Sequence, residues 1–118
     1  MVPMRHKRIR FGHLRLNGVP VDVRYGDLLV AQDDASPLLD WEVVLATRQP
    51  LQLAQASYDV HIETADCGQL WGSGVLVRSD GKAHVLRGSG GLNGFERVGF
   101  DGTRPGSSDV GAAPPTAC

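Results

Sequence analysis

The sequence predicts an all-β antiparallel fold, because runs of alternating apolar and polar residues lie between closely spaced turn signals. Three dipeptides that end in glycine, Asn17-Gly18, Cys67-Gly68 and Asp80-Gly81, are typical of two-residue hairpin loops. About seven short strands fit between these and other turn signals, and no stretch has the apolar period of an amphipathic helix. We therefore expect a single-domain small barrel, with a two-sheet sandwich as the alternative.

The composition agrees with one globular unit. The chain has 118 residues, of which 42% are hydrophobic, so it can bury a core without a metal or disulfides. A formal net charge of -1 gives no whole-chain reason to expect nucleic acid or an acidic membrane as a partner. No apolar run has the length of a membrane span, and no signal-peptide core follows the basic N-terminus. We expect a cytoplasmic protein without a membrane partner, and its preference for arginine over lysine is typical of GC-rich bacterial genes.

Both ends of the chain lack the pattern of a core. Residues 1–8 are predicted to form a flexible basic arm, and residues 103–118 are rich in Gly, Ser, Pro and Ala, which is typical of a disordered tail. The β domain is accordingly expected to span residues 9–102. Cys67 and Cys118 fall at a predicted hairpin tip and at the last residue, so we expect two free thiols.

The first hairpin is predicted over residues 11–24. A two-residue loop at Asn17-Gly18 pairs Leu16 with Val19. Pro20 lacks a backbone N–H donor, so its strand is expected at an edge of the sheet.

The next strands are predicted over residues 28–32 and 41–47, with an acidic loop between them. The second of these strands has apolar residues on both faces, which indicates that it is covered on both sides. Residues 51–56 have the composition of a helix but are too short for a stable one, so this segment is ambiguous. A last short strand is predicted over residues 95–100.

Residues 58–91 are predicted to form a three-stranded meander. A loop at Cys67-Gly68 places Val60 opposite Val75, and a loop at Asp80-Gly81 places Val75 opposite Leu86. This register puts one set of side chains on a common face: Tyr58, Val60, Ile62, Trp71, Val75, Val77, His84 and Leu86.

The common face supplies the predicted ligand site. Tyr58, Trp71 and His84 would line the barrel interior and offer apolar surface with one polar group to orient a small apolar ligand. The alternative is a structural histidine whose ring bonds to the Tyr58 hydroxyl or to a backbone carbonyl. In both interpretations Trp71 is expected to be a core anchor and His84 to be buried.

Leu76 and Val85 are predicted to face outwards, where two adjacent apolar side chains are out of place. We expect them to form an interface, either with a second copy of the chain as a homodimer or with residues 51–56.

Asp59, His61 and Glu63 also project outwards, at alternate positions of one strand. Carboxylate and imidazole groups bind zinc and iron, but no second histidine at metal spacing accompanies them, so we expect a solvated face and no metal. The basic residues between Arg5 and Arg10 have no exposed aromatic stripe beside them, and we expect no nucleic-acid partner.

The expected function is therefore binding, of a small apolar ligand or of a partner, without catalysis and without a cofactor. The rival hypothesis is a small enzyme that uses His84 as general acid or base with Asp59, Glu63 or Asp40. Those carboxylates fall off the face that carries His84, which weighs against a ready-made catalytic pair.

Overall fold

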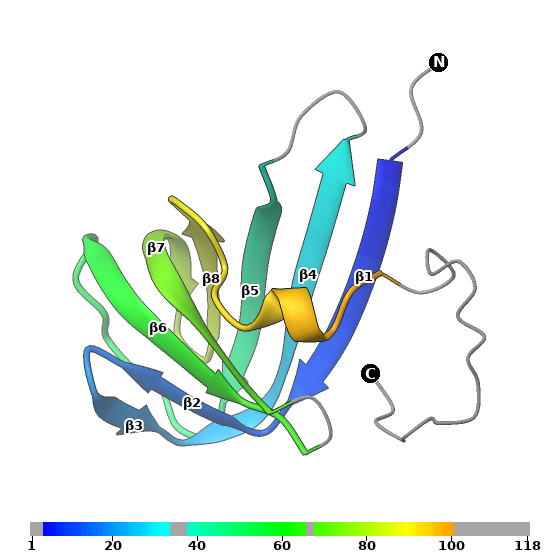
Figure 1. The fold of residues 1–118 in the computed structure, drawn as a ribbon. Coiled ribbons are helices and arrows are strands. Elements are labelled where there is room, and N and C mark those ends of the chain that lie inside the picture. The colour runs from blue at the N-terminus through cyan, green and yellow to red at the C-terminus, as the bar shows by residue number, and fades with distance from the viewer. Residues whose placement is uncertain (1–3, 34–37, 66–67, 101–118) are drawn as a thin grey trace.

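The computed structural model describes residues 4–33, 38–65 and 68–100. Within these residues, eight strands form one antiparallel sheet in the order β1-β4-β5-β8-β7-β6-β2-β3 (Figure 1). The elements are β1 (Met4–Phe11), β2 (His13–Leu16), β3 (Val19–Val21), β4 (Val23–Asp33), β5 (Asp40–Thr47), β6 (Ser57–Glu63), β7 (Gln69–Asp80), β8 (Ala83–Gly88) and the 3-10 helix η1 (Phe95–Arg97).

The first hairpin forms as its turn dipeptide predicts. Asn17 and Gly18 have φ angles of 53° and 81°, the positive values that a tight hairpin loop requires at both positions. Leu16 pairs with Val19, and Pro20 lies on β3 at an end of the strand order, so the predicted register and edge position are confirmed.

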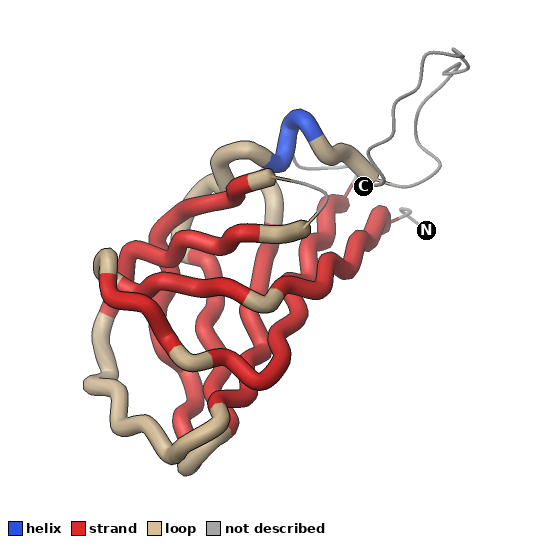
Figure 2. Tube along the Cα trace, turned by 90° about the horizontal axis from the view of Figure 1, so that it is seen from below, coloured by secondary structure: helices blue, strands red, loops and turns tan. Residues whose placement is uncertain are grey.

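The N-terminal strands occupy both ends of the sheet. Only Gly12 separates β1 from β2, and only Asp22 separates β3 from β4. The strand β1 pairs with β4 at one end of the order, while β2 pairs with β3 and β6 at the other end, so the sheet curls back on itself (Figures 1 and 2). The edge strands β1 and β3 do not pair with each other within the described residues. The predicted all-β barrel or sandwich is confirmed as an antiparallel barrel that is not closed.

A C-terminal segment contributes to the core beside β1. Leu92, Phe95 and Phe100 are buried, and the rings of Phe95 and Phe100 meet edge to face with centroids 5.1 Å apart. The guanidinium of Arg5 on β1 lies 5.1 Å from the centroid of the Phe100 ring. The strand predicted over residues 95–100 is wrong: this segment contains η1, whose residues pack against the sheet instead of pairing with it (Figure 1).

Trp41 on β5 is a large aromatic residue of the core, with 2% of its surface exposed. Its ring fills a slot that exists because glycines line it: a Cβ atom at Gly88 would lie 2.2 Å from the ring, and one at Gly72 would lie 2.9 Å from it. The indole N–H donates to the carbonyl of Gly90 over 2.9 Å. The glycines in β7 and β8 therefore make room for a side chain.

The register of β6 and β7 differs from the prediction. Val60 pairs with Gly72 instead of Val75, because the loop is wider than two residues and closes where the Thr64 N–H donates to the Gly68 carbonyl over 3.0 Å. A shift by an odd number of residues moves every side chain of a strand to the other face. Trp71 consequently faces outwards with 44% of its surface exposed, and the prediction that it anchors the core is wrong.

The β7/β8 hairpin departs from the prediction at two points. Asp80 pairs with Ala83, and an irregularity between Leu76 and Arg78 then shifts the ladder by one residue. Leu76 therefore pairs with Leu86 and is buried, while Val77 is 49% exposed.

The structure also corrects the predicted boundaries of the domain. The strand β1 begins at Met4, so the flexible arm predicted over residues 1–8 is wrong for residues 4–8, which pair with β4. Residues 51–56 contain no helix, although Leu53 packs against the core. The predicted tail at 103–118 and both cysteines lie outside the described residues. No helix in the described part of the chain is long and apolar enough to cross a membrane.

Candidate functional site

An open groove lies on the outer face of β6 and β7, beside the segment that follows β8. We call it the Trp71 groove, and its volume is about 810 Å³. It is lined by Asp59, Val60, His61, Gln69, Trp71, Gly72, Ser73, Ser89, Gly90, Gly91 and Asn93.

Backbone contacts attach the wall of the groove, residues 89–93, to β7. The Trp71 N–H donates to the Asn93 carbonyl over 3.1 Å, and the Asn93 N–H donates to the Trp71 carbonyl over 2.7 Å. The Asn93 side-chain amide donates to the same Trp71 carbonyl over 3.1 Å. At the other end of the wall, the Ser89 N–H donates to the Ser73 carbonyl over 2.9 Å. The wall is thus held at both of its ends.

The core supports this wall from the inside. Trp41 donates its indole proton to the Gly90 carbonyl, so the position of the wall depends on the glycine-lined slot described above. Gly72 lies in the floor, and a Cβ atom there would approach the Gly91 carbonyl oxygen to 2.5 Å. A larger residue at this position would displace the wall from the floor.

Trp71 and His61 form the aromatic part of the groove. The two rings are cross-strand neighbours with centroids 6.1 Å apart and an angle of 54° between their planes. The His61 Nε2 atom is hydrogen-bonded to the Gln69 side-chain oxygen over 3.0 Å. Because Trp71 is almost half exposed, its indole is available to a ligand at the surface.

Asp59 is the one carboxylate among the described residues that line the groove, and none of these residues is lysine or arginine. Its backbone is tied to the first hairpin: the Asp59 N–H donates to the Asn17 side-chain oxygen over 2.8 Å, and the Asn17 N–H donates to the Asp59 carbonyl over 2.9 Å. The carboxylate makes no ion pair with any residue that the structure describes. The local charge of the groove is therefore negative.

A smaller cavity of about 280 Å³ adjoins the groove and shares His61 and Gln69 with it. Arg15, Glu63 and His13 also line this cavity. The described residues contain no group of three His, Cys, Asp or Glu side chains arranged to hold a metal ion.

The structure does not bring together the three residues of the predicted interior site. Trp71 is on the outer face, and Tyr58 is half-buried and donates its hydroxyl proton to the Ala54 carbonyl over 2.5 Å. His84 is completely buried, as predicted, with its Nδ1 atom 2.8 Å from the Ser79 hydroxyl oxygen. The prediction that these three residues share an interior face is therefore wrong. Trp71 lies instead on the outer face, with Asp59 and His61.

His84 has an unusual environment for a titratable group. Its Nε2 atom has no hydrogen-bond partner among the described residues, and burial lowers its pKa from the ordinary value of 6.5. Its hydrogen bond goes to Ser79 and not to Asp59, Glu63 or Asp40, the carboxylates of the enzyme hypothesis.

The predicted interface is corrected in part. Leu76 is buried in the core, so it cannot contact another molecule, because the irregularity in β7 turns it inwards. Val85 is half-buried on the outer face. Self-association through Val85 stays a prediction.

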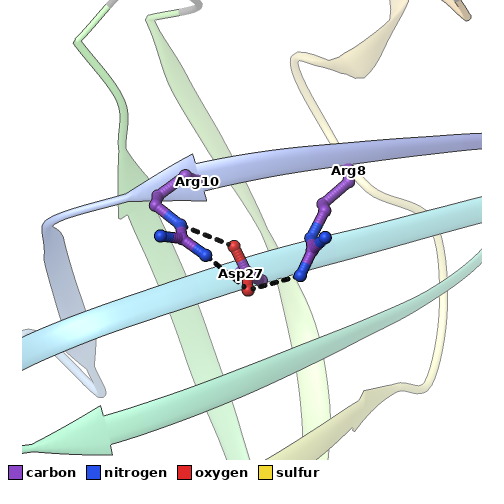
Figure 3. Close-up of polar contacts among 3 residues, drawn as sticks. All are labelled: Arg8, Arg10 and Asp27. Carbon is purple, nitrogen blue, oxygen red and sulfur yellow. Dashed lines mark hydrogen bonds and ion pairs between the residues drawn. The ribbon is translucent and has the colours of Figure 1, made fainter.

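A cluster of charges on the outer face of β1 and β4 has a structural role. Arg8 and Arg10 on β1 both contact the Asp27 carboxylate on β4, at 3.3 Å and 3.0 Å (Figure 3). The hydrogen bond from Arg10 lowers the pKa of Asp27, which is 8% exposed. The guanidinium of Arg10 also lies 5.9 Å from the centroid of the Tyr25 ring. These contacts form because β1 pairs with β4. They were not predicted from the sequence, because residues 1–8 were expected to be a flexible arm.

A second open groove, of about 920 Å³, lies over β1, β4 and β5. Its polar lining mixes basic residues such as Arg8 and Arg87 with acidic Asp40 and Glu42, and its one aromatic ring besides His6 belongs to the buried Trp41. It therefore lacks an exposed aromatic surface, and the Trp71 groove is the stronger candidate.

Comparisons with models of protein families, with curated proteins and with solved structures find no match to this chain.

Proposed function

We propose that this protein is a non-catalytic binding domain that holds a saccharide in the Trp71 groove. The observation that carries the proposal is a half-exposed indole with a rim of hydrogen-bonding side chains. A sugar ring presents C–H groups on its faces and hydroxyl groups around its edge. An aromatic face beside polar groups complements both of these surfaces.

The rim of the groove contains the donors and acceptors that hydroxyl groups need. Asp59 accepts hydrogen bonds, Ser73 and Ser89 can donate and accept, and the Asn93 side chain also reaches the rim. The Ser89 hydroxyl already donates to the Ser73 carbonyl over 3.2 Å, which leaves its oxygen as an acceptor. These groups come from β6, β7 and the wall, so a ligand would contact three parts of the chain.

Two other ligand classes fit the groove less well. A phosphate backbone is bound mainly by lysine and arginine, and the described lining contains neither. A small apolar ligand would need an enclosed apolar pocket, whereas this groove is open and rimmed by polar side chains.

The proposal is tested by titrating the protein with a panel of disaccharides that differ in linkage and substituents. NMR chemical shifts of the protein report the binding of each disaccharide. We expect at least one disaccharide to bind with a Kd of about 1 mM or tighter and to shift the indole N–H signal of Trp71. Trp71→Ala should weaken that binding about tenfold or more, since a ring stacked on an aromatic side chain contributes roughly 1–3 kcal/mol in nucleobase complexes.

Tyr25→Ala is the matched control, because Tyr25 is 48% exposed, close to the exposure of Trp71, and lies outside the groove. This variant should bind the sugar as the parent does. Binding that survives Trp71→Ala, or shifts that map to other faces of the sheet, would show that the groove is not a saccharide site.

A further inference from the structure

We infer that the Trp71 groove selects saccharides that carry a free, positively charged amino group. The inference rests on the proposed saccharide-binding function and adds the charge of the ligand to it. The feature that carries it is the position of the Asp59 carboxylate beside an exposed indole in a groove without basic side chains among its described residues.

Asp59 is placed to reach a group on a sugar that stacks on Trp71. Asp59 pairs with Ser73, and His61, two residues further along β6, pairs with Trp71, so Asp59 and Trp71 are diagonal neighbours on the same face. Diagonal neighbours in an antiparallel pair are about 7–8 Å apart, a separation that one sugar ring with an amino substituent can bridge.

The Asp59 carboxylate is available to a ligand. The contacts with Asn17 involve the backbone of Asp59 and hold it in place, while the carboxylate forms no ion pair in the described part of the chain. Glu63, the next acidic residue on this face of β6, lines the adjoining cavity instead of the groove.

The indole favours the same ligand charge as the carboxylate. The face of a tryptophan ring attracts a cation, and an ammonium group held between the ring and a carboxylate interacts favourably with both. The basic residue nearest in the strand ladder is Arg15, which pairs with His61 and lines the adjoining cavity instead of the groove. Arg15 is two strands from Trp71, a distance of about 10 Å. It is also a diagonal neighbour of Asp59 across β2 and β6, but these two side chains form no ion pair in the described part of the chain.

The test compares two forms of one sugar: the β-1,4-linked glucosamine disaccharide and its di-N-acetyl derivative, which has the same rings without the charge. Both are titrated by NMR at one pH at which the amines are protonated. We expect the parent protein to bind the amine form about three- to fivefold more tightly, as expected for one exposed ion pair with its contact to the ring.

Asp59→Asn should remove this preference by weakening only the amine form. Glu63→Gln is the matched control, because it removes one negative charge from the same face of the same strand but outside the groove. This control should keep the preference within about twofold, since screening weakens a charge that does not contact the ligand.

The outcomes separate the inference from the function beneath it. Equal affinity for the two sugars in the parent, or a preference that Glu63→Gln removes as completely as Asp59→Asn does, overturns the charge selection and leaves saccharide binding intact. Binding of neither sugar, together with no binding across the disaccharide panel, overturns both. A preference that is lost in Asp59→Asn alone supports the inference.

Discussion

Because the slot around Trp41 is already filled, we expect a single added methyl group, in Gly88→Ala, to lower the stability of the fold. A Cβ atom at Gly88 would lie 2.2 Å, 2.3 Å and 2.5 Å from three atoms of the Trp41 indole, whereas real Cβ atoms essentially never approach a neighbour closer than 3.0 Å. The ring cannot simply move away. Gly72 and Gly74 limit it on the neighbouring strand, and its N–H is bonded to Gly90.

The expected loss of stability follows from two costs and one gain. Overpacking a filled core costs about 1–3 kcal/mol, and losing the hydrogen bond to Gly90 costs about 0.5–1.5 kcal/mol. Replacing glycine by alanine returns about 0.4–1 kcal/mol, because the unfolded chain becomes less flexible. We therefore expect Gly88→Ala to lower the free energy of unfolding by about 0.5–4 kcal/mol.

Urea denaturation monitored by circular dichroism measures this loss, with Gly91→Ala as the control. Gly91 is in the same segment, a Cβ atom added to it would meet no other atom within 4 Å, and its φ angle is not positive. This control should be as stable as the parent or slightly more stable. In a Trp41→Leu background, Gly88→Ala should cost much less stability than it does in the parent, because the ring that the new methyl group overlaps is absent. Equal stability of Gly88→Ala and Gly91→Ala would refute the slot as the reason for glycine at position 88.

Two further predictions concern pH. Burial lowers the pKa of His84 in the folded state below its ordinary value of 6.5, so its contribution to stability is complete above pH 6.5 and is lost as the pH falls towards the folded pKa. His84→Phe should therefore lose less stability than the parent between pH 7 and about 5 in urea denaturation, and an identical slope for both proteins would contradict this. The hydrogen bond from Arg10 lowers the pKa of Asp27 in the folded state. The contribution of Asp27 to the stability of the fold is therefore complete above the ordinary pKa of a carboxyl group, and it is lost as the pH falls through the folded pKa. Asp27→Asn should lower stability at pH 7 and flatten the acid side of the thermal unfolding profile, whereas an unchanged acid profile would mean that the contacts in Figure 3 contribute nothing.

The proposed saccharide site and the stability of the core are linked through one side chain. Trp41 fills the slot and also donates to the wall of the Trp71 groove. A change that displaces the Trp41 ring is therefore expected to disturb ligand binding as well as stability. Gly88 and Gly72 leave room for the Trp41 ring inside the sheet, and the candidate site lies on the outer face of the same part of the sheet.

The sequence by itself determined the features that depend on local chemistry. Asn17-Gly18 selects a tight loop, and a loop of known length sets the pairing of Leu16 with Val19. Trp41, Val43 and Leu45 occupy alternate positions of β5, which places them on one face, and all three are buried. His84 was also predicted to be buried, and it is, because the shift of two residues near the β7/β8 turn preserves the face of each side chain.

Only the tertiary structure decided the face of Trp71 and the existence of the groove. The loop before β7 is wider than its dipeptide indicates, and the irregularity near Val77 exchanges inner and outer positions, so Trp71 and Leu76 have opposite faces from those predicted. Neither feature has a local sequence signal, because each depends on which partner strand offers the better packing. The wall reaches Trp71 through Asn93, a contact between residues far apart in the sequence, and its position depends on how Trp41 fills a space left by glycines on two other strands.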